Sequence, residues 1–289
     1  MRADLHCYTK LSHSSLGIDD LITLAQKRNI EAIAITDRDC QAGIVRARMA
    51  GERKGVTVIP GVLFSCYDSK RNGYADILCY LADSPDRLEG LCRNNLIAKK
   101  RSNQITTIKT AKKYPITPEL ISKCATGATA VYDHHIMHAL CECGMADGFY
   151  GKVYEDLFTA ESENNVLTKV SYAAPEDVLN AIHESGGIAV LAHPGLYGNF
   201  DLLEELCGKG LDGVEIHTPF NTQSDIETLL TFCKGKELLM TGGTEFMGMY
   251  SKSMMSVGDI LTPEADVKAL MNYKTKMKKR KATAEKLNA

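Results

Sequence analysis

Residues 184–195 read Glu-Ser-Gly-Gly-Ile-Ala-Val-Leu-Ala-His-Pro-Gly and combine a glycine pair, an apolar run and a His-Pro-Gly sequence. Four apolar residues, 188–191, follow a glycine pair and predict a short buried strand. A histidine, a proline and a glycine come directly after that strand. In folds built on parallel strands, chemistry gathers at the C-terminal ends of the strands, so His193 is a candidate functional residue.

The same pattern of a short strand followed by a helix extends outward in both directions. Residues 31–36 and 211–216 predict further buried strands, as do residues 56–59 and 237–241. Residues 18–29 and 41–54 have the apolar spacing of amphipathic helices. Strands alternating with helices predict an α/β fold with a parallel sheet, open or closed into a barrel.

The middle of the chain has a different pattern. No strand is predicted between about residues 85 and 165, where residues 88–111, 118–124, 134–143 and 153–161 are typical of helices. We therefore expect a discontinuous barrel domain, a helical insertion and a basic tail. Their predicted bounds are 1–84 with 166–272, 85–165 and 273–289.

Composition narrows the functional classes. The chain has 289 residues, 44% of them hydrophobic, and a net charge of −2, so no global charge points to nucleic acid or membrane. Ten cysteines without a leader segment predict reduced thiols and a cytoplasmic location. Residues 273–289 carry a net charge of about +6, which fits either a solvated helix end or a nucleic-acid contact.

Residues 4–9, Asp-Leu-His-Cys-Tyr-Thr, come close to a metal motif. A strand ending with two histidines two residues apart would place both imidazoles on one face, where they can bind a divalent cation. Here His6 is present, but Tyr8 occupies the second position. The frame of a metal motif is kept, and one ligand is replaced.

Residues of this kind recur after strand ends in a fixed order, and the order resembles that of the PHP family (polymerase and histidinol phosphatase domain). The resemblance rests on six segments: residues 4–13, 37–39, 60–63, 75–80, 184–195 and 242–248. It implies a distorted (β/α)7 barrel with two or three divalent metals at its mouth and metal-dependent phosphoester hydrolysis. The branch with a helical insertion contains nucleotide phosphoesterases and a 5′-to-3′ exonuclease.

The resemblance also says which ligands this chain keeps. His6, His135 and His193 match the family's motifs, and His13, Asp76 and Glu245 differ from them but can still coordinate a metal. These six are the candidate metal ligands. The changed positions that cannot replace the family's residues are Tyr8, Arg38, Leu63, Asp133 and Met247.

Because Leu63 cannot bridge two cations and Arg38 adds a permanent positive charge, we expect zero or one divalent metal (Mn, Fe, Zn or Mg). Arg38 and His134 are candidates for contact with a substrate phosphate. Arg38 is expected either to pair with Asp37, Asp76 or Glu245 or to point into solvent.

The leading functional hypothesis is a PHP-type phosphoesterase homologue with a decayed metal site, inactive or strongly impaired, that still binds a phosphate-bearing molecule or nucleotide. One alternative is an active phosphoesterase using a single metal held by His6, His13, His193 and Glu245. The other is a non-catalytic ligand-binding or interaction protein, in which the basic tail contacts nucleic acid. No membrane partner is expected, because no apolar stretch approaches the roughly 20 residues of a membrane span.

Overall fold

The computed structural model describes the backbone of residues 1–287 and the side chains of residues 1–277. Seven strands form one sheet in the order of the sequence. The strands are β1 (Ala3–Cys7), β2 (Ala32–Ile35), β3 (Thr57–Asp68), β4 (Gly73–Tyr80), β5 (Ile188–Leu191), β6 (Gly213–His217) and β7 (Leu239–Gly242). A bridge between Cys7 and Phe246 brings the last strand end to the first, so the sheet curves into a nearly closed barrel.

Most neighbouring strands are parallel, as the strand–helix alternation predicts, but β4 is antiparallel to both β3 and β5. Only residues 69–72 connect β3 to β4. Such a short connection makes a hairpin, whereas a parallel pair needs a crossover of a dozen or more residues. The expectation of a wholly parallel sheet was therefore wrong at this strand.

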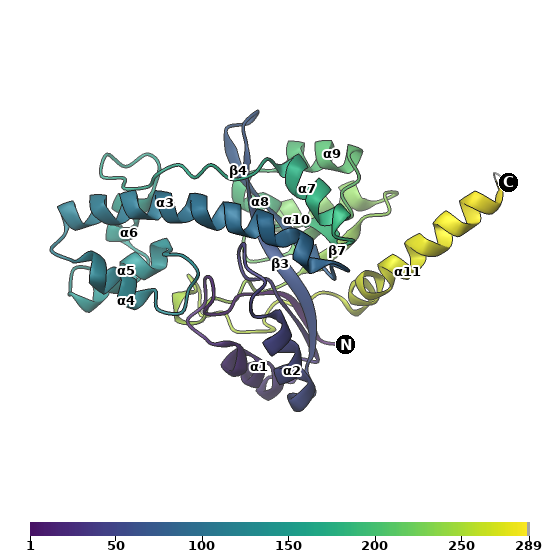
Figure 1. Ribbon diagram of the computed structural model, residues 1–289, viewed down its shortest axis with the longest axis horizontal. Coiled ribbons are helices and arrows are strands. Elements are labelled where there is room, and N and C mark those ends of the chain that lie inside the picture. Colours follow the sequence, from purple (N-terminus) through teal and green to yellow (C-terminus); the bar gives the residue numbers. More distant parts are fainter. Residues whose placement is uncertain (288–289) are drawn as a thin grey trace.

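Helices cover the outside of the barrel, and a further group of helices is inserted in the sequence between the neighbouring strands β4 and β5 (Figure 1). The helices around the barrel are α1 (Ile18–Lys27), α2 (Ile44–Lys54), α7 (Pro175–Glu184), α8 (Pro194–Tyr197), α9 (Phe200–Gly208) and α10 (Gln223–Cys233). Those between β4 and α7 are the 3-10 helix η1 (Pro85–Leu88), α3 (Glu89–Lys113), α4 (Pro118–Cys124), α5 (Asp133–Glu142) and α6 (Lys152–Phe158).

The barrel interior is a single apolar cluster to which six strands contribute. Its members include Leu5, Ala34, Leu63, Leu78 and Val190, all fully buried. The helices α4, α5 and α6 have a separate core around Ile121, Met137, Leu140 and Leu157. These helices lie to one side of the long helix α3, and the sheet lies against its other part (Figure 1).

The chain ends with the 3-10 helix η2 (Gly248–Tyr250) and then α11 (Glu264–Leu287), which projects away from the body (Figure 1). The expected basic tail, residues 273–289, falls on α11, but the side chains after Met277 lie outside the described residues. Within residues 1–287, none of the helices combines the length and the apolar character that a membrane-spanning segment needs.

Candidate metal centre and ligand cleft

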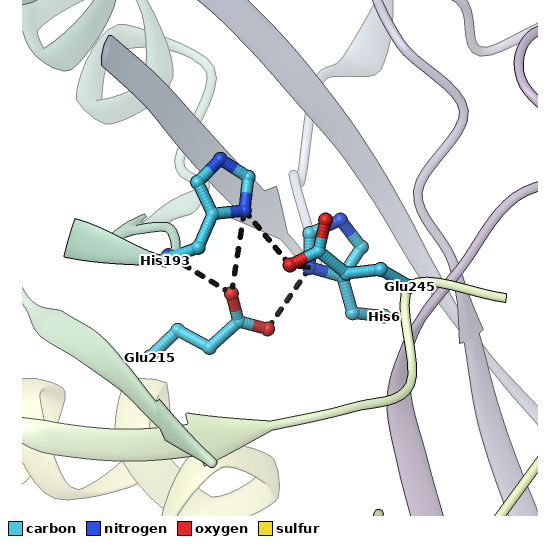
Figure 2. A group of neighbouring side chains, drawn as sticks. All are labelled: His6, His193, Glu215 and Glu245. Atoms are coloured by element: carbon cyan, nitrogen blue, oxygen red, sulfur yellow. Dashed lines mark hydrogen bonds and ion pairs between the residues drawn. The ribbon is translucent and has the colours of Figure 1, made fainter. Parts of the chain in front are cut away.

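Four buried side chains meet near the ends of the barrel strands (Figure 2). His6 and Glu215 lie in β1 and β6, while His193 and Glu245 directly follow β5 and β7. The His6 Nδ1 atom is 2.9 Å from Glu215 Oε1, and the His193 Nδ1 atom is 2.9 Å from Glu245 Oε1. One ligand atom from each residue lies within 4.8 Å of the others, the spacing expected of a metal-binding group.

Backbone conformation helps to direct two of these side chains inward. His193 and Glu245 have φ angles of 28° and 49°, in the left-handed region that non-glycine residues seldom adopt. The backbone N–H of His193 donates to Glu215 Oε2 at 3.0 Å, and the Thr218 hydroxyl donates to Glu245 Oε1 at 2.7 Å. These bonds hold strained residues in place at the strand ends.

Tyr8 occupies the position of the missing histidine and closes the group. Its hydroxyl is 2.9 Å from His6 Nε2 and donates to Glu245 Oε2 at 3.4 Å. Because the phenol has a single proton, it can donate to Glu245 only while it accepts from His6. Both ring nitrogens of His6 are therefore hydrogen-bonded within the protein.

Arg38 is hydrogen-bonded to the same network from the other side. Its Nη1 donates to Asp76 Oδ1 at 2.6 Å and to the Ser65 hydroxyl at 2.9 Å. The second carboxylate oxygen of Asp76 is 3.0 Å from His193 Nε2. Asp76 is one of the three carboxylates with which Arg38 was expected to pair, and the two side chains are 2% and 14% exposed.

The electrostatics of these contacts favours charged side chains. Burial alone would lower the pKa of His193, but Glu245 and Asp76 raise it to about 10. Burial would raise the pKa of Glu245, and His193 and His6 instead lower it to about 2. Burial opposes a charge on His6 as well, yet Glu215 and Glu245 raise its pKa above the ordinary value. The His193 imidazolium and Arg38 thus face the carboxyl groups of Asp76, Glu215 and Glu245, and Glu215 and Glu245 also favour the protonated form of His6.

The replaced positions Leu63 and Met247 lie in or against the apolar cluster to which Tyr8 also belongs. Leu63 is fully buried in the apolar cluster of the barrel interior, which also contains Tyr8, and Met247 is partly buried against that cluster. A second cation beside Leu63 would have no carboxylate from that residue.

Two aspartates of the sequence motifs have local structural partners instead. Asp37 accepts hydrogen bonds from the backbone N–H and hydroxyl of Thr9 and from the Ser12 hydroxyl. Asp39 accepts from the Asn95 amide at 2.7 Å, and burial raises its pKa to about 7. Both carboxyl groups lie outside the four-residue group.

The two other expected histidine ligands, His13 and His135, do not join that group either, and His134, the candidate phosphate contact, also lies outside it. His135 Nδ1 accepts from the backbone N–H of Tyr132 and caps α5. His13 packs its ring against Tyr132 at 4.0 Å, and its buried Nδ1 has no hydrogen-bond partner among the described residues. His134 is 1% exposed, and both of its ring nitrogens also lack a hydrogen-bond partner there.

A cleft lies next to the network, between the barrel and the helices that follow β4. It consists of two cavities of about 450 Å³ and 550 Å³. Both are lined by His13, Arg38, Asp133 and Tyr197, so they adjoin each other at these residues. The first cavity also contacts Asp76 and Lys99, and the second contacts Tyr8 and Glu245.

The sequence motifs place three of the six candidate ligands, His6, His193 and Glu245, in the four-residue group. Asp76 contacts it through His193, while His13 and His135 lie outside it. Glu215 was missed. Its only sequence signal is a carboxylate inside the apolar strand of residues 211–216, where an unpaired charge would be costly to bury.

Comparisons with known proteins identify relatives of this chain. The chain is 29% identical over 256 residues to the phosphoribosyl 1,2-cyclic phosphate 1,2-diphosphodiesterase of Eggerthella lenta, covering 87% of this chain and 96% of that protein. It is 30% identical over 201 residues to the 5′-3′ exoribonuclease Rnm of Escherichia coli, covering 67% and 66%.

Among solved structures, a protein from Bifidobacterium adolescentis proposed to be a metal-dependent phosphoesterase superposes with a TM-score of 0.85. The two are 24% identical, and the match covers 93% of this chain and 95% of that one, so it supports the fold. The family model of the PHP domain matches residues 4–204. The strand order, the residues at the strand ends and this match together show that the chain belongs to the PHP domain family.

Proposed function

We propose that this chain binds a ribose phosphate ester in the cleft beside Arg38 and hydrolyses it very slowly or not at all. The observation that carries the proposal is the continuous network Glu215–His6–Tyr8–Glu245–His193–Asp76–Arg38, in which all four imidazole nitrogens have a protein partner.

Such a network competes with a metal cluster. A histidine binds a metal through a nitrogen lone pair, and a protonated nitrogen has none to offer. Hydrolysis of this type requires a metal-generated hydroxide and neutralisation of the phosphoryl charge. Because Tyr8, Arg38 and Leu63 replace ligands rather than supply them, both requirements are poorly met.

The ligand class follows from the relatives and from the cleft. The Eggerthella lenta and Escherichia coli relatives are named for a phosphoribosyl cyclic phosphate and for RNA, which share a ribose phosphate ester. The first cavity of the cleft is lined by Arg38 and Lys99, whose cationic groups suit a phosphate.

The test combines metal analysis with turnover. Protein purified without chelator should contain at most one equivalent of Mn, Fe or Zn, and it should release little phosphate from adenosine 3′,5′-bisphosphate or cleave little 5′-phosphorylated RNA in Mn²⁺. Two or three metal equivalents, together with Mn²⁺-stimulated turnover that His193→Ala abolishes, would overturn the proposal.

A second candidate, an active phosphoesterase with one metal, is supported by the four-residue group itself. Two imidazoles and two carboxylates are a donor set suited to Zn²⁺, Mn²⁺ or Fe²⁺. His6, His193, Glu215 and Glu245 would hold the ion, which would polarise a phosphoester oxygen. This set differs from the one expected from sequence, with Glu215 in place of His13.

Burial argues against that alternative. His6, His193 and Glu215 are 0% exposed and Glu245 is 6% exposed, whereas a catalytic metal keeps one coordination position open to substrate. Titration with Zn²⁺ or Mn²⁺ followed by calorimetry distinguishes the two. One tight equivalent that Glu215→Gln weakens, together with turnover that depends on it, would favour the mono-metal enzyme.

A further inference from the structure

Lys99 is a cation without a partner inside the cleft. It lies in α3 and lines the cavity of about 450 Å³. Its ammonium forms no hydrogen bond or salt bridge with any residue that the structure describes, and its one specific contact is with the Tyr132 ring at 5.4 Å. Lys99 is partly exposed, and its ammonium has three donors that an acceptor in the cavity can use.

Other unsatisfied polar atoms belong to residues that line the same cavity. Arg38 Nε, His13 Nδ1 and the Thr168 hydroxyl are all buried without a hydrogen-bond partner among residues 1–277. Buried polar groups are nearly always hydrogen-bonded in folded proteins. A cavity bordered by several unpaired polar groups and a free ammonium is therefore complementary to a molecule rich in acceptor oxygens.

The charges around the cavity favour an anion at Lys99. Arg38 lies on the same wall, and its own carboxylate partner, Asp76, is shared with His193. Asp133 is the acidic group that acts most strongly on Lys99, but its Oδ2 accepts from the Tyr154 hydroxyl at 2.8 Å. Asp133 and Arg38 thus line both cavities where they adjoin, whereas Lys99 lines the first cavity alone and adds a second cation to it.

We propose that Lys99 is the centre of an anion subsite that binds the phosphoryl group of the ligand, so that α3 and Arg38 supply the positive charge that a metal would otherwise supply. This inference rests on the proposed function, because it deals with the same ligand. It adds the position of the phosphate, which lies on the insertion side of the cleft and away from His6 and Glu215.

The rest of the ligand extends past Asp133 into the second cavity. That cavity is lined by aromatic and apolar side chains, including Phe220, Tyr150 and Met255, and also by charged and hydroxyl groups, among them Arg38, Glu245 and Lys252. Asp133 repels the phosphate from the junction, and its carboxylate can accept a hydrogen bond from a sugar hydroxyl. The cleft thus orients a phosphomonoester with its phosphate toward Lys99.

The experiment is calorimetric titration with adenosine 5′-monophosphate, and with adenosine as the uncharged comparison, in buffer containing EDTA. Lys99→Met keeps an unbranched apolar side chain close to the lysine stem in length and removes the ammonium. Lys100→Met is the matched control, since Lys100 is the next residue of α3 and is exposed. We expect Lys99→Met to weaken binding of the monophosphate by about tenfold or more, because a charge-assisted hydrogen bond is lost. Lys100→Met should change it by less than about twofold.

Asp133→Asn gives a test of opposite sign that does not depend on the folding of the lysine variant. It removes the negative charge next to Lys99 and keeps an acceptor for Tyr154, so binding of the monophosphate should tighten by about threefold or more while adenosine binding is unchanged. Binding of the monophosphate that neither Lys99→Met nor Asp133→Asn alters would overturn the inference and leave the proposed function intact. No binding of the monophosphate to the unaltered protein in EDTA would overturn both.

Discussion

Arg38 brings a permanent positive charge into the site and pairs with a buried carboxylate. Where the resemblance to the PHP family implies a histidine, the chain has a guanidinium that donates to Asp76 at 2.6 Å, while His193 contacts the other oxygen of that carboxylate. Removing one member of a buried ion pair leaves the other member charged and unpaired. The stability of the fold should therefore depend on Arg38.

Arg38→Ala should lower the free energy of unfolding by on the order of 3 kcal/mol, measured by urea denaturation in the presence of EDTA. Arg46→Ala is a suitable control, because Arg46 pairs with Asp19 at exposed positions and the loss should be about 0–1 kcal/mol. Equal losses for the two variants would show that Arg38 is solvated in solution.

At the scale of single residues, the sequence identified those that lie in recognisable motifs. The pairing of Arg38 with a carboxylate could be anticipated because Asp37, Asp76 and Glu245 were all expected near one end of the barrel. Glu215 could not, because no motif surrounds it and a carboxylate within a strand is not informative by itself. His135 could not be excluded as a ligand either, since its role as a helix cap depends on the backbone of Tyr132.

At the scale of secondary-structure elements, the burial of β3 explains why restoring a single family-type ligand should not restore metal binding. Its residue Leu63 is fully buried in the apolar cluster of the barrel interior, to which Tyr8 also belongs. Leu63→Glu by itself introduces an unpaired charge there and should cost on the order of 3 kcal/mol, without a gain in metal content. Leu63→Met, which nearly conserves volume, should cost less than about 1.5 kcal/mol.

The combined variant Tyr8→His, Arg38→His, Leu63→Glu and Met247→His should bind more metal than any of the four single variants, because a multinuclear site needs its ligands jointly. Elemental analysis after dialysis against Mn²⁺ measures this. A single reversion that restores two equivalents would contradict the idea that the ligands act together.

The direction of a strand is a feature that apolar spacing in the sequence does not predict. The buried strands and most of the helices could be read from apolar spacing. The antiparallel direction of β4 depends on the length of one loop, residues 69–72, and apolar spacing carries no information on direction. The direction matters for function, since it places Asp76 opposite Ser65 and within reach of Arg38.

At the scale of the whole molecule, the two apolar cores should respond separately. Met137 is fully buried in the core of α4, α5 and α6, which is distinct from the barrel interior. Met137→Ala should therefore lower amide hydrogen-exchange protection mainly in residues 114–166, at a cost of about 2–5 kcal/mol to that unit. Strands β1–β7 should keep their protection.

Leu78→Ala in the barrel interior is the matched comparison, and it should lower protection in the strands. If Met137→Ala instead reduces protection equally throughout residues 1–277, the helices and the barrel unfold as one unit. That result would also mean that ligand binding at Lys99 in α3 stabilises the entire chain rather than the helical segment alone.

The apolar filling around Leu63, Tyr8 and Met247 also has a consequence for the history of such a protein. With these side chains in the apolar interior, each family-type metal ligand introduced alone should lower the stability of the fold, although the full set together should improve metal binding. A lineage regaining a metal cluster one substitution at a time would therefore pass through variants that are less stable than the present protein. A lineage with this interior is expected to diverge toward new ligands in the cleft more readily than it returns to its former chemistry.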